Sequence, residues 1–163
     1  MNKKYKKGSS IIEVIIYTFL SLTLLLVLTD VFSQLLNKSQ ESVSMSEVEV
    51  DGKFISQKIY NQIAQASGIS LPANLGDTSN TFTLAINSSN YSYYLSGTNM
   101  FLNDGITIER LNSYGTIVSN LTAQRLGNPG GKPIIRISFD ITSTIIQAQG
   151  NESKNYLITA GLR

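Results

Sequence analysis

The sequence predicts an α+β fold: one long N-terminal α-helix, membrane-spanning in its first half, packs by its second half on an antiparallel β-sheet head. The 163-residue chain has an almost wholly apolar run at 11–28, and neither Gly nor Pro occurs between Ser9 and Asp51. After Pro72 the apolar spacing changes from three or four residues to two, the spacing of strands. The expected segments are a basic leader (1–8), a membrane-spanning half-helix (9–36), an amphipathic half-helix (37–67) and a β-rich globular head (68–163).

Basic residues at the N-terminus orient the predicted membrane segment. Four of the 13 basic residues precede Gly8, namely Lys3, Lys4, Lys6 and Lys7. As a helix, the apolar run 11–28 spans roughly 27 Å, close to the hydrocarbon thickness of a bilayer. The positive-inside rule therefore predicts a cytoplasmic N-terminus and an exported head. Without these lysines, 9 basic residues (13 − 4) stand against 11 acidic ones, so the sequence predicts no direct nucleic-acid binding.

The second half of the helix is predicted from one recurring apolar face. Its members lie three, four or seven residues apart, and they are Val48, Ile55, Ile59, Ile63 and Ala66. Gly68 and Pro72 end this pattern, so the helix is expected over about 10–67. Gly52 weakens the pattern without ending it. The polar stretch 37–46 is where a break is most expected.

The head is predicted to be an antiparallel sheet because its apolar, β-branched and aromatic residues alternate with polar ones. The expected strands are 81–86, 91–96, 106–111, 133–149 and 155–163. The last two, joined by the turn-like Gly150-Asn151, are expected to form a hairpin. Asn103-Asp104-Gly105 predicts a tight turn with left-handed backbone at Asp104 or Gly105.

The composition predicts neither catalysis nor a cofactor. Cys and His are both absent, which excludes disulfides, thiolate or imidazole metal ligands and His-based triads. The spacing of the head carboxylates gives no indication that two of them converge in a cleft, as acid–base catalysis would need. The head carboxylates are Asp77, Asp104, Glu109, Asp140 and Glu152. Asp77 could supply one Ca²⁺ ligand, but a repeated Asp/Asn spacing is missing, so no metal site is predicted. Tyr91, Tyr93 and Tyr94 are expected to pack across strands rather than to contact a ligand.

One short motif, KKGSSIIEV, gives a more specific interpretation of the N-terminus. It resembles the processing site of type IV prepilins and pseudopilins: a basic leader ending in Gly8, then a small apolar stretch closing with Glu13 as the fifth mature residue. The resemblance implies that a membrane prepilin peptidase cuts between Gly8 and Ser9, and that Ser9 becomes the N-terminus and is a candidate for N-methylation. The family usually begins its mature chain with Phe or another bulky apolar residue, and this chain has Ser9 there.

The same resemblance implies a role for Glu13 and a set of partners. In packed pilins Glu13 of one subunit would neutralise the amino terminus of its neighbour. A paired charge in low dielectric is tolerated and an unpaired one is not, so this pairing would set the axial register of the subunits. The implied partners are other pilins or pseudopilins, through helix–helix contacts in a filament core and head–head contacts, the prepilin peptidase and the inner-membrane assembly platform. The order of the head segments looks most like minor pilins and pseudopilins of the PilW/GspJ type. The implied protein waits in the cytoplasmic membrane and then joins a pilus, a type II secretion pseudopilus or a competence filament.

Other interpretations of the N-terminus remain open. A secretory signal peptide could be cleaved after Val31-Phe32-Ser33, although the apolar run is long for one. A plain signal anchor fits the length and the charge but leaves Glu13 unexplained, unless its carboxyl is protonated or reaches the membrane interface. The rival function is a bitopic membrane protein that displays an extracellular β domain as an adhesin or ligand-binding module.

Overall fold

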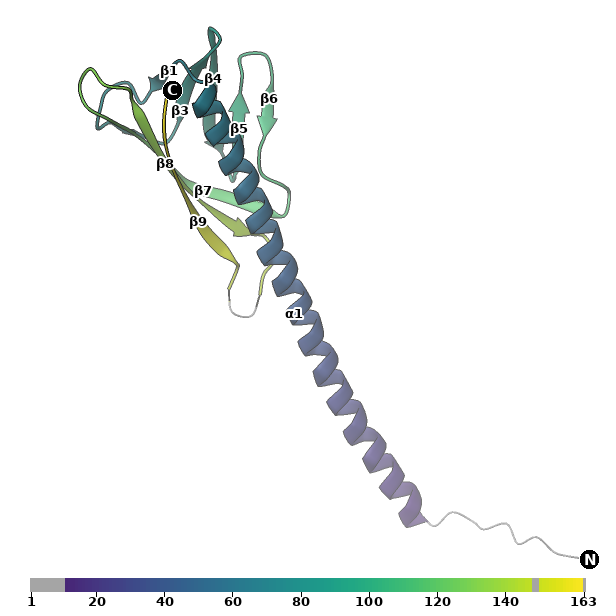
Figure 1. Ribbon diagram of the computed structural model, residues 1–163. Helices are drawn as coiled ribbons and strands as arrows, with labels where there is room; N and C mark the ends of the chain where they lie inside the picture. The colour runs from purple at the N-terminus through teal and green to yellow at the C-terminus, as the bar shows by residue number, and fades with distance from the viewer. Residues whose placement is uncertain (1–10, 148–149, 163) are drawn as a thin grey trace, which may run out of the picture. The chain divides into compact units, whose positions relative to one another are not determined.

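The computed structural model describes residues 11–147 and 150–162 and confirms the α+β layout. One helix, α1 (Ile11–Gln65, 55 residues), is followed by two antiparallel sheets (Figure 1). The helix has no interruption at 37–46, where a break was most expected. The chain divides into two compact units, residues 1–39 and 40–163, and α1 contributes to both. We call residues 11–36 of α1 the apolar half and residues 40–65 the docked half.

The docked half of α1 buries one face against the strands of its own unit. The buried residues recur every three or four positions, and they are Ser44, Val48, Asp51, Gly52, Ile55, Ile59 and Ile63. This spacing is one stripe of an α-helix, so the stripe alone faces the sheets while the rest of the docked half remains at least partly exposed. The apolar face predicted from the sequence is therefore the face that packs.

Sheet A has five strands in the order β1-β3-β4-β5-β6. Its strands are β1 (Gly68–Leu71), β3 (Phe82–Ile86), β4 (Ser89–Ser96), β5 (Asn99–Asn103) and β6 (Ile108–Arg110). The predicted turn at Asn103-Asp104-Gly105 links β5 to β6. Asp104 Oδ1 accepts from the backbone N of Ile106 at 2.9 Å and Gly105 has a φ of 90°, so the left-handed residue is the glycine.

Sheet B has four strands in the order β2-β7-β8-β9. Its strands are β2 (Thr78–Ser79), β7 (Thr116–Leu126), β8 (Ile134–Ser143) and β9 (Ser153–Gly161). The predicted hairpin of the last two strands is confirmed, since β8 and β9 pair antiparallel without a register shift. Two sheets instead of one are a correction to the prediction.

The longest strand, β7, was not predicted, and its register explains why. Thr116 and Val118 are buried before Asn120, whereas Leu121 and Ala123 are buried after it. Asn120 has a φ of 53° and lies where the pairing with β8 shifts, which is the geometry of a bulge. The bulge moves the buried side chains from even to odd positions, so no single alternation runs through the strand.

The predicted strand 133–149 is too long, because β8 ends at Ser143. Beyond that residue the backbone leaves the ladder: Thr144 N donates to Gly115 O at 2.9 Å, and Ser143 Oγ accepts from Ile145 N at 3.1 Å. The bond from Thr144 holds the start of the β8–β9 connection against the loop before β7, and the bond from Ile145 closes a local turn. The turn-like Gly150 follows with a φ of 102°.

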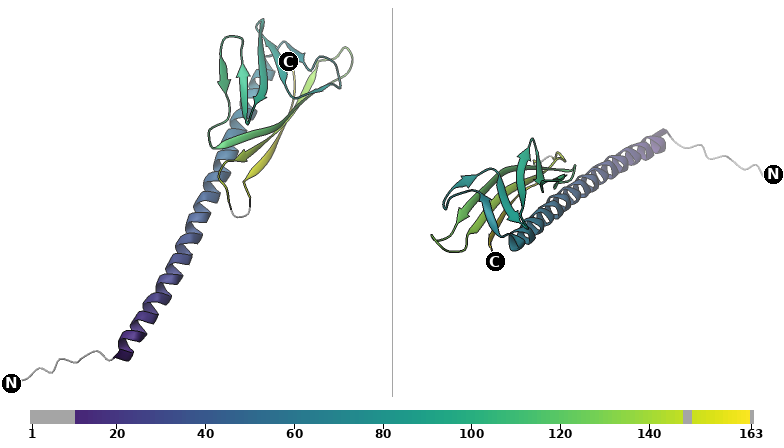
Figure 2. Two further views of the ribbon diagram at one scale, coloured as in Figure 1. Left: turned by 180° about the vertical axis from the view of Figure 1, so that it is seen from behind. Right: turned by 90° about the horizontal axis from the view of Figure 1, so that it is seen from above.

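The core of the 40–163 unit lies between the docked half of α1 and the inward faces of both sheets. Three isoleucines of α1, Ile55, Ile59 and Ile63, are completely buried. Sheet A contributes fully buried Phe82, and sheet B contributes fully buried Phe139. Seen from above in Figure 2, both sheets lie on one side of the docked half, so one helical stripe is enough to cover them.

Candidate functional site

The apolar half of α1 exposes every large hydrophobic side chain it has. These residues include Ile11, Phe19, Leu26 and Phe32, whose exposed fractions lie between 64% and 79%. This stretch is the one segment of the described residues that is long and apolar enough to cross a membrane. Such a surface is unfavourable in water at about 25 cal/mol for each Å² of apolar area, so it needs lipid or other helices around it.

Three threonine hydroxyls in the apolar half are satisfied within the helix. Thr18 Oγ1 donates to Val14 O, and Thr23 Oγ1 donates to Phe19 O at 2.9 Å. Thr29 Oγ1 likewise donates to Leu25 O at 2.8 Å. These groups therefore do not oppose burial in an apolar environment, where an unpaired hydroxyl would be costly.

Glu13 lies in the first turn of α1, with Tyr17 one turn away. The hydroxyl of Tyr17 donates to Glu13 Oε1 at 3.4 Å, a long hydrogen bond between two exposed side chains. A carboxylate here interacts favourably with the unpaired N–H groups of the helix N-terminus. One neutral donor does not cancel the charge of Glu13, so a cationic partner would favour its burial in an apolar environment.

The remaining residues of the predicted processing site lie outside the described residues. They are Gly8 and Ser9 at the predicted cut and Lys3, Lys4, Lys6 and Lys7 in the predicted leader. Their roles stay predictions from the sequence.

Asp51 fixes the docked half of α1 to the loop before β7. Its Oδ2 accepts from the backbone N of Ser113 at 2.8 Å and from the hydroxyl of Thr116. Asp51 is 9% exposed, and hydrogen bonds to a buried carboxylate are stronger than bonds between neutral groups. This carboxylate therefore holds the helix at one rotation and one height against sheet B.

Gly52 allows β9 to approach the docked half closely. A Cβ at this position would overlap the ring of Tyr156, whose hydroxyl donates to Val48 O at 3.0 Å. Tyr156 also stacks on Phe139, with ring centroids 5.5 Å apart. The glycine in the helix, costly for helix propensity, is thus explained by the aromatic ring that occupies the place of its side chain.

A second tyrosine reaches α1 from sheet A. Tyr93 is fully buried, stacks on Phe82 with ring centroids 4.4 Å apart, and donates its hydroxyl to Gln62 Oε1. Burial raises the pKa of Tyr93, and the negative charge of Glu109 raises it further. Phe82 and Tyr93 are direct cross-strand partners, as are Phe101 and Tyr94, so the predicted cross-strand packing is confirmed for these two tyrosines.

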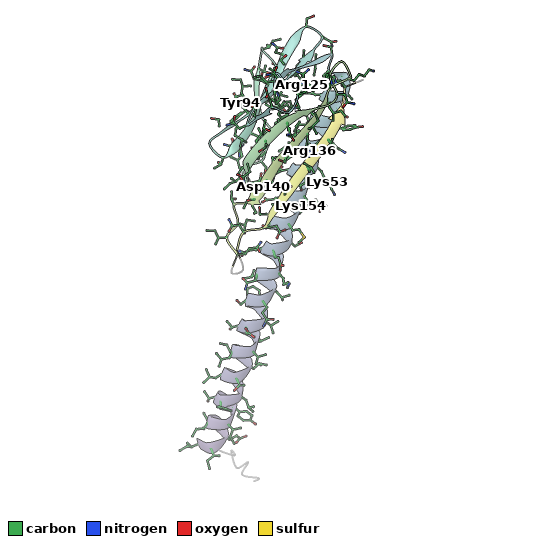
Figure 3. The ribbon with its side chains drawn as sticks, turned by 90° about the vertical axis from the view of Figure 1, so that its left-hand side faces the viewer. Lys53, Tyr94, Arg125, Arg136, Asp140 and Lys154 are labelled. Carbon is green, nitrogen blue, oxygen red and sulfur yellow. The ribbon has the colours of Figure 1, made fainter. Side chains whose placement is uncertain are left out.

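Ion pairs line the rim of the docked half. Lys58 pairs with Glu109 of β6, and Glu49 lies 2.9 Å from Lys53 and 4.0 Å from Lys154 of β9. The hydrogen bond and charge of Lys53, with the more distant Lys154, hold the pKa of Glu49 below its usual value. Figure 3 shows Lys53 and Lys154 on the same side of the molecule, where α1 and β9 run next to each other. Water and dissolved salt screen the exposed pairs of Glu49, so these pairs add little to stability.

The head carboxylates considered in the sequence serve separate local contacts. The backbone N–H groups of Thr107 and Ile106 lower the pKa of Asp104, whereas the side-chain amides of Asn120 and Asn155 lower the pKa of Asp140. Asp77 Oδ2 accepts from the side chain of Asn74 at 2.9 Å. Among the described residues, no group of three or more acidic side chains could hold a metal ion.

Sequence reasoning singled out Glu13 but missed the residues that dock α1, namely Asp51, Gly52 and Tyr156. Gly52 carried a usable signal, because a single glycine inside a helical pattern often marks close packing. Asp51 carried no such signal in the sequence. The docking role of this polar residue on an apolar face becomes visible only when the structure places its two donors, Ser113 and Thr116, beside it. Comparisons of this chain with protein-family models, with curated proteins and with solved structures find no match.

Proposed function

We propose that this chain is a minor type IV pilin or pseudopilin, a structural subunit that helps to initiate, cap or adapt a pilus or pseudopilus. It would be made with a cytoplasmic leader, cut after Gly8, held in the membrane by the apolar half of α1 and then moved into the filament by the assembly platform. Its role would be structural rather than catalytic.

One observation carries this proposal: a single unbroken helix changes from exposed and apolar to docked on a β-rich head. Every large hydrophobic residue of 11–36 is exposed, whereas Val48, Ile55, Ile59 and Ile63 are buried. A lipid anchor needs only the apolar half. A subunit that leaves the membrane for a filament needs a helix that remains ordered in both places, and continuity of α1 supports that requirement.

Glu13 supports the proposal as the acidic residue in the first turn of that helix. In a filament its partner would be the amino group of Ser9 on a neighbouring subunit. The energetic reason is that a lone charge in an apolar helix bundle costs several kcal/mol, whereas a paired one costs much less. The pairing would favour one axial step over all others.

Mass spectrometry of the mature protein tests the processing step. We expect the membrane-bound protein to lack residues 1–8, with or without one added methyl group at Ser9, and we expect Gly8→Ala to retain the leader. A mature protein with an intact N-terminus would contradict the pilin proposal and favour the bitopic display protein. Cleavage after Ser33 would favour a secretory signal peptide.

A variant of Glu13 tests the assembly step. We expect Glu13→Ala to be stable, cut and inserted in the membrane but absent from sheared filaments, whereas Asp30→Ala, a matched loss of one carboxylate further along the same helix, should still be incorporated. Immunoblots of the membrane and filament fractions measure this. Normal incorporation of Glu13→Ala would remove the proposed role of this residue.

A further inference from the structure

Each acidic residue of the apolar half has a neutral hydrogen-bond donor four positions later. Residues 11–36 contain two acids, Glu13 and Asp30, and no Lys or Arg. Tyr17 Oη donates to Glu13 Oε1 at 3.4 Å, and Gln34 Nε2 donates to Asp30 Oδ2 at 3.0 Å. Side chains of an α-helix tilt toward its N-terminus, so each donor reaches back over the turn that carries the acid. The repeated spacing indicates that carboxyl groups in this segment are satisfied without a basic residue.

The two acid–donor pairs lie near opposite ends of the segment that would cross the membrane. Glu13 and Asp30 are 17 positions apart (30 − 13), which is roughly 26 Å of helix and close to the hydrocarbon thickness of a bilayer. The pair of Glu13 is at the end that follows the predicted cut. In the proposed filament, Glu13 gains the amino group of a neighbouring subunit. Before assembly, Tyr17 is the donor that the described residues offer to this carboxyl group.

Lipid would make the contact between Tyr17 and Glu13 stronger than it is in water. At 3.4 Å it is a long hydrogen bond, and both side chains are exposed, so water competes for both groups. Hydrocarbon contains no such competitor, and an unpaired carboxylate or hydroxyl is costly there. Each group therefore gains from bonding to the other. The bond occupies Oε1 of the carboxyl group, and a carboxylate can accept a second donor at Oε2.

We propose that Tyr17 is a positioning residue for Glu13. Its hydroxyl holds Oε1 while the subunit waits in the membrane, which leaves Oε2 open to the amino group of a neighbouring subunit when the filament grows. The inference rests on the proposed function, because that amino group is formed only when the chain is cut between Gly8 and Ser9. The hydroxyl of Tyr17 carries this role, whereas an aromatic anchor at the membrane interface would depend mainly on its ring.

Two substitutions of Tyr17 separate the hydroxyl from the ring. Tyr17→Phe keeps the ring, and it should lower the share of membrane-inserted, leader-free chain that enters sheared filaments by about tenfold, as expected for one hydrogen bond to a charged group. Tyr17→Gln loses the ring but supplies an amide donor, as Gln34 does for Asp30, and should restore incorporation to within about threefold of the parent chain. Immunoblots of the membrane and filament fractions measure both.

Gln34→Leu is the matched control, because it removes the donor of the other pair and should change incorporation less than about twofold. The reverse order, with Tyr17→Phe incorporated and Tyr17→Gln lost, would show that the ring matters and would overturn the proposal. Equal incorporation of both Tyr17 variants would overturn it too, as would a tenfold loss with Gln34→Leu.

A spectroscopic measurement tests the contact without filaments. In the full chain purified from membranes, held in lipid bicelles and labelled with ¹³C at tyrosine Cζ, the Tyr17 resonance is the one that Tyr17→Phe removes. We expect Glu13→Ala to shift this resonance and Asp30→Ala to leave it in place. A resonance that does not respond to Glu13→Ala would overturn the role of Tyr17 even where filaments form. A shift in a chain that retains residues 1–8 would confirm the contact but contradict the pilin proposal, and with it the positioning role.

Discussion

The two halves of α1 belong to one helix but satisfy opposite requirements. In the apolar half, Leu25 and Leu26 on neighbouring faces are both exposed, at 59% and 68%. In the docked half, Ile55 and Ile59 are completely buried, whereas Phe54 and Tyr60 beside them are about half exposed. Apolar residues all around a helix indicate lipid or other helices on every side, and apolar residues in one stripe indicate one partner surface.

This difference shows that the role of each half of α1 depends on how its hydrophobic residues are distributed around the helix, and not on how many there are. The docked half contains charged residues such as Lys53 and Glu49 on its exposed faces and still buries a complete stripe. Its stability comes from the sheets it contacts. The large hydrophobic residues of the apolar half are exposed instead, so substitutions in the two halves should have different effects on the head.

Truncation of the buried stripe should produce the largest effect. Ile59→Ala should lower the free energy of unfolding of the head by about 3 kcal/mol, because it removes buried methyl and methylene groups and leaves a cavity. Leu25→Ala, an equally large truncation in the apolar half, should leave head unfolding unchanged within about 0.5 kcal/mol. Denaturant unfolding of the detergent-solubilised full chain measures both. An effect of Ile59→Ala as small as the one expected for Leu25→Ala would show that the head does not depend on the docked half.

Filling the space at Gly52 should have the next largest effect. Gly52→Ala should destabilise the head by about 2 kcal/mol, because the new methyl group overlaps the ring of Tyr156. In a Tyr156→Ala background the same change should become stabilising, by up to about 1 kcal/mol, since only helix propensity then remains. Thermal unfolding of the four proteins of this double-mutant cycle provides the test. A cost that persists without the ring would rule out close packing as the reason for glycine.

The sequence predicted the long helix and most strands because each follows one simple period. Val48, Ile55, Ile59 and Ile63 recur at helical spacing, and the buried residues of β8 alternate without interruption from Ile135 to Ile141. β7 could not be predicted in this way, because the bulge at Asn120 interrupts its alternation. The division into two sheets depends on which strands pair, and the local pattern carries no information about that.

The candidate site was predictable to a different degree in the two halves of α1. Glu13 is conspicuous in the sequence because an acidic residue is rare in an apolar run, and no packing information is needed to notice it. Asp51 lies in the buried stripe beside Val48 and Ile55. Its role depends on Ser113 and Thr116, more than 60 residues away in the chain. Long-range contacts of this kind cannot be read from local spacing.

The two tyrosine hydroxyls that bond to the docked half should give the smallest effect, visible at high pH. Burial raises the pKa of both Tyr93 and Tyr156, and nearby carboxylates raise them further: Glu109 for Tyr93, and Glu49 with Asp51 for Tyr156. A group whose pKa is raised on folding stabilises the fold below its unfolded pKa, which is about 10 for tyrosine, and loses this contribution as pH rises through the folded pKa. The free energy of unfolding should therefore fall above about pH 10.

Phenylalanine variants assign this alkaline loss to the docked half. Tyr93→Phe combined with Tyr156→Phe should flatten the fall in unfolding free energy above about pH 10, because the two ionisable donors to Gln62 and Val48 are gone. Tyr94→Phe is the matched control, since Tyr94 stacks on Phe101 of sheet A and does not bond to α1. Urea unfolding at pH 8 and at pH 11 measures the difference. If the double variant lost as much stability as the parent between these pH values, the alkaline sensitivity would come from groups outside the contact between the docked half and the sheets.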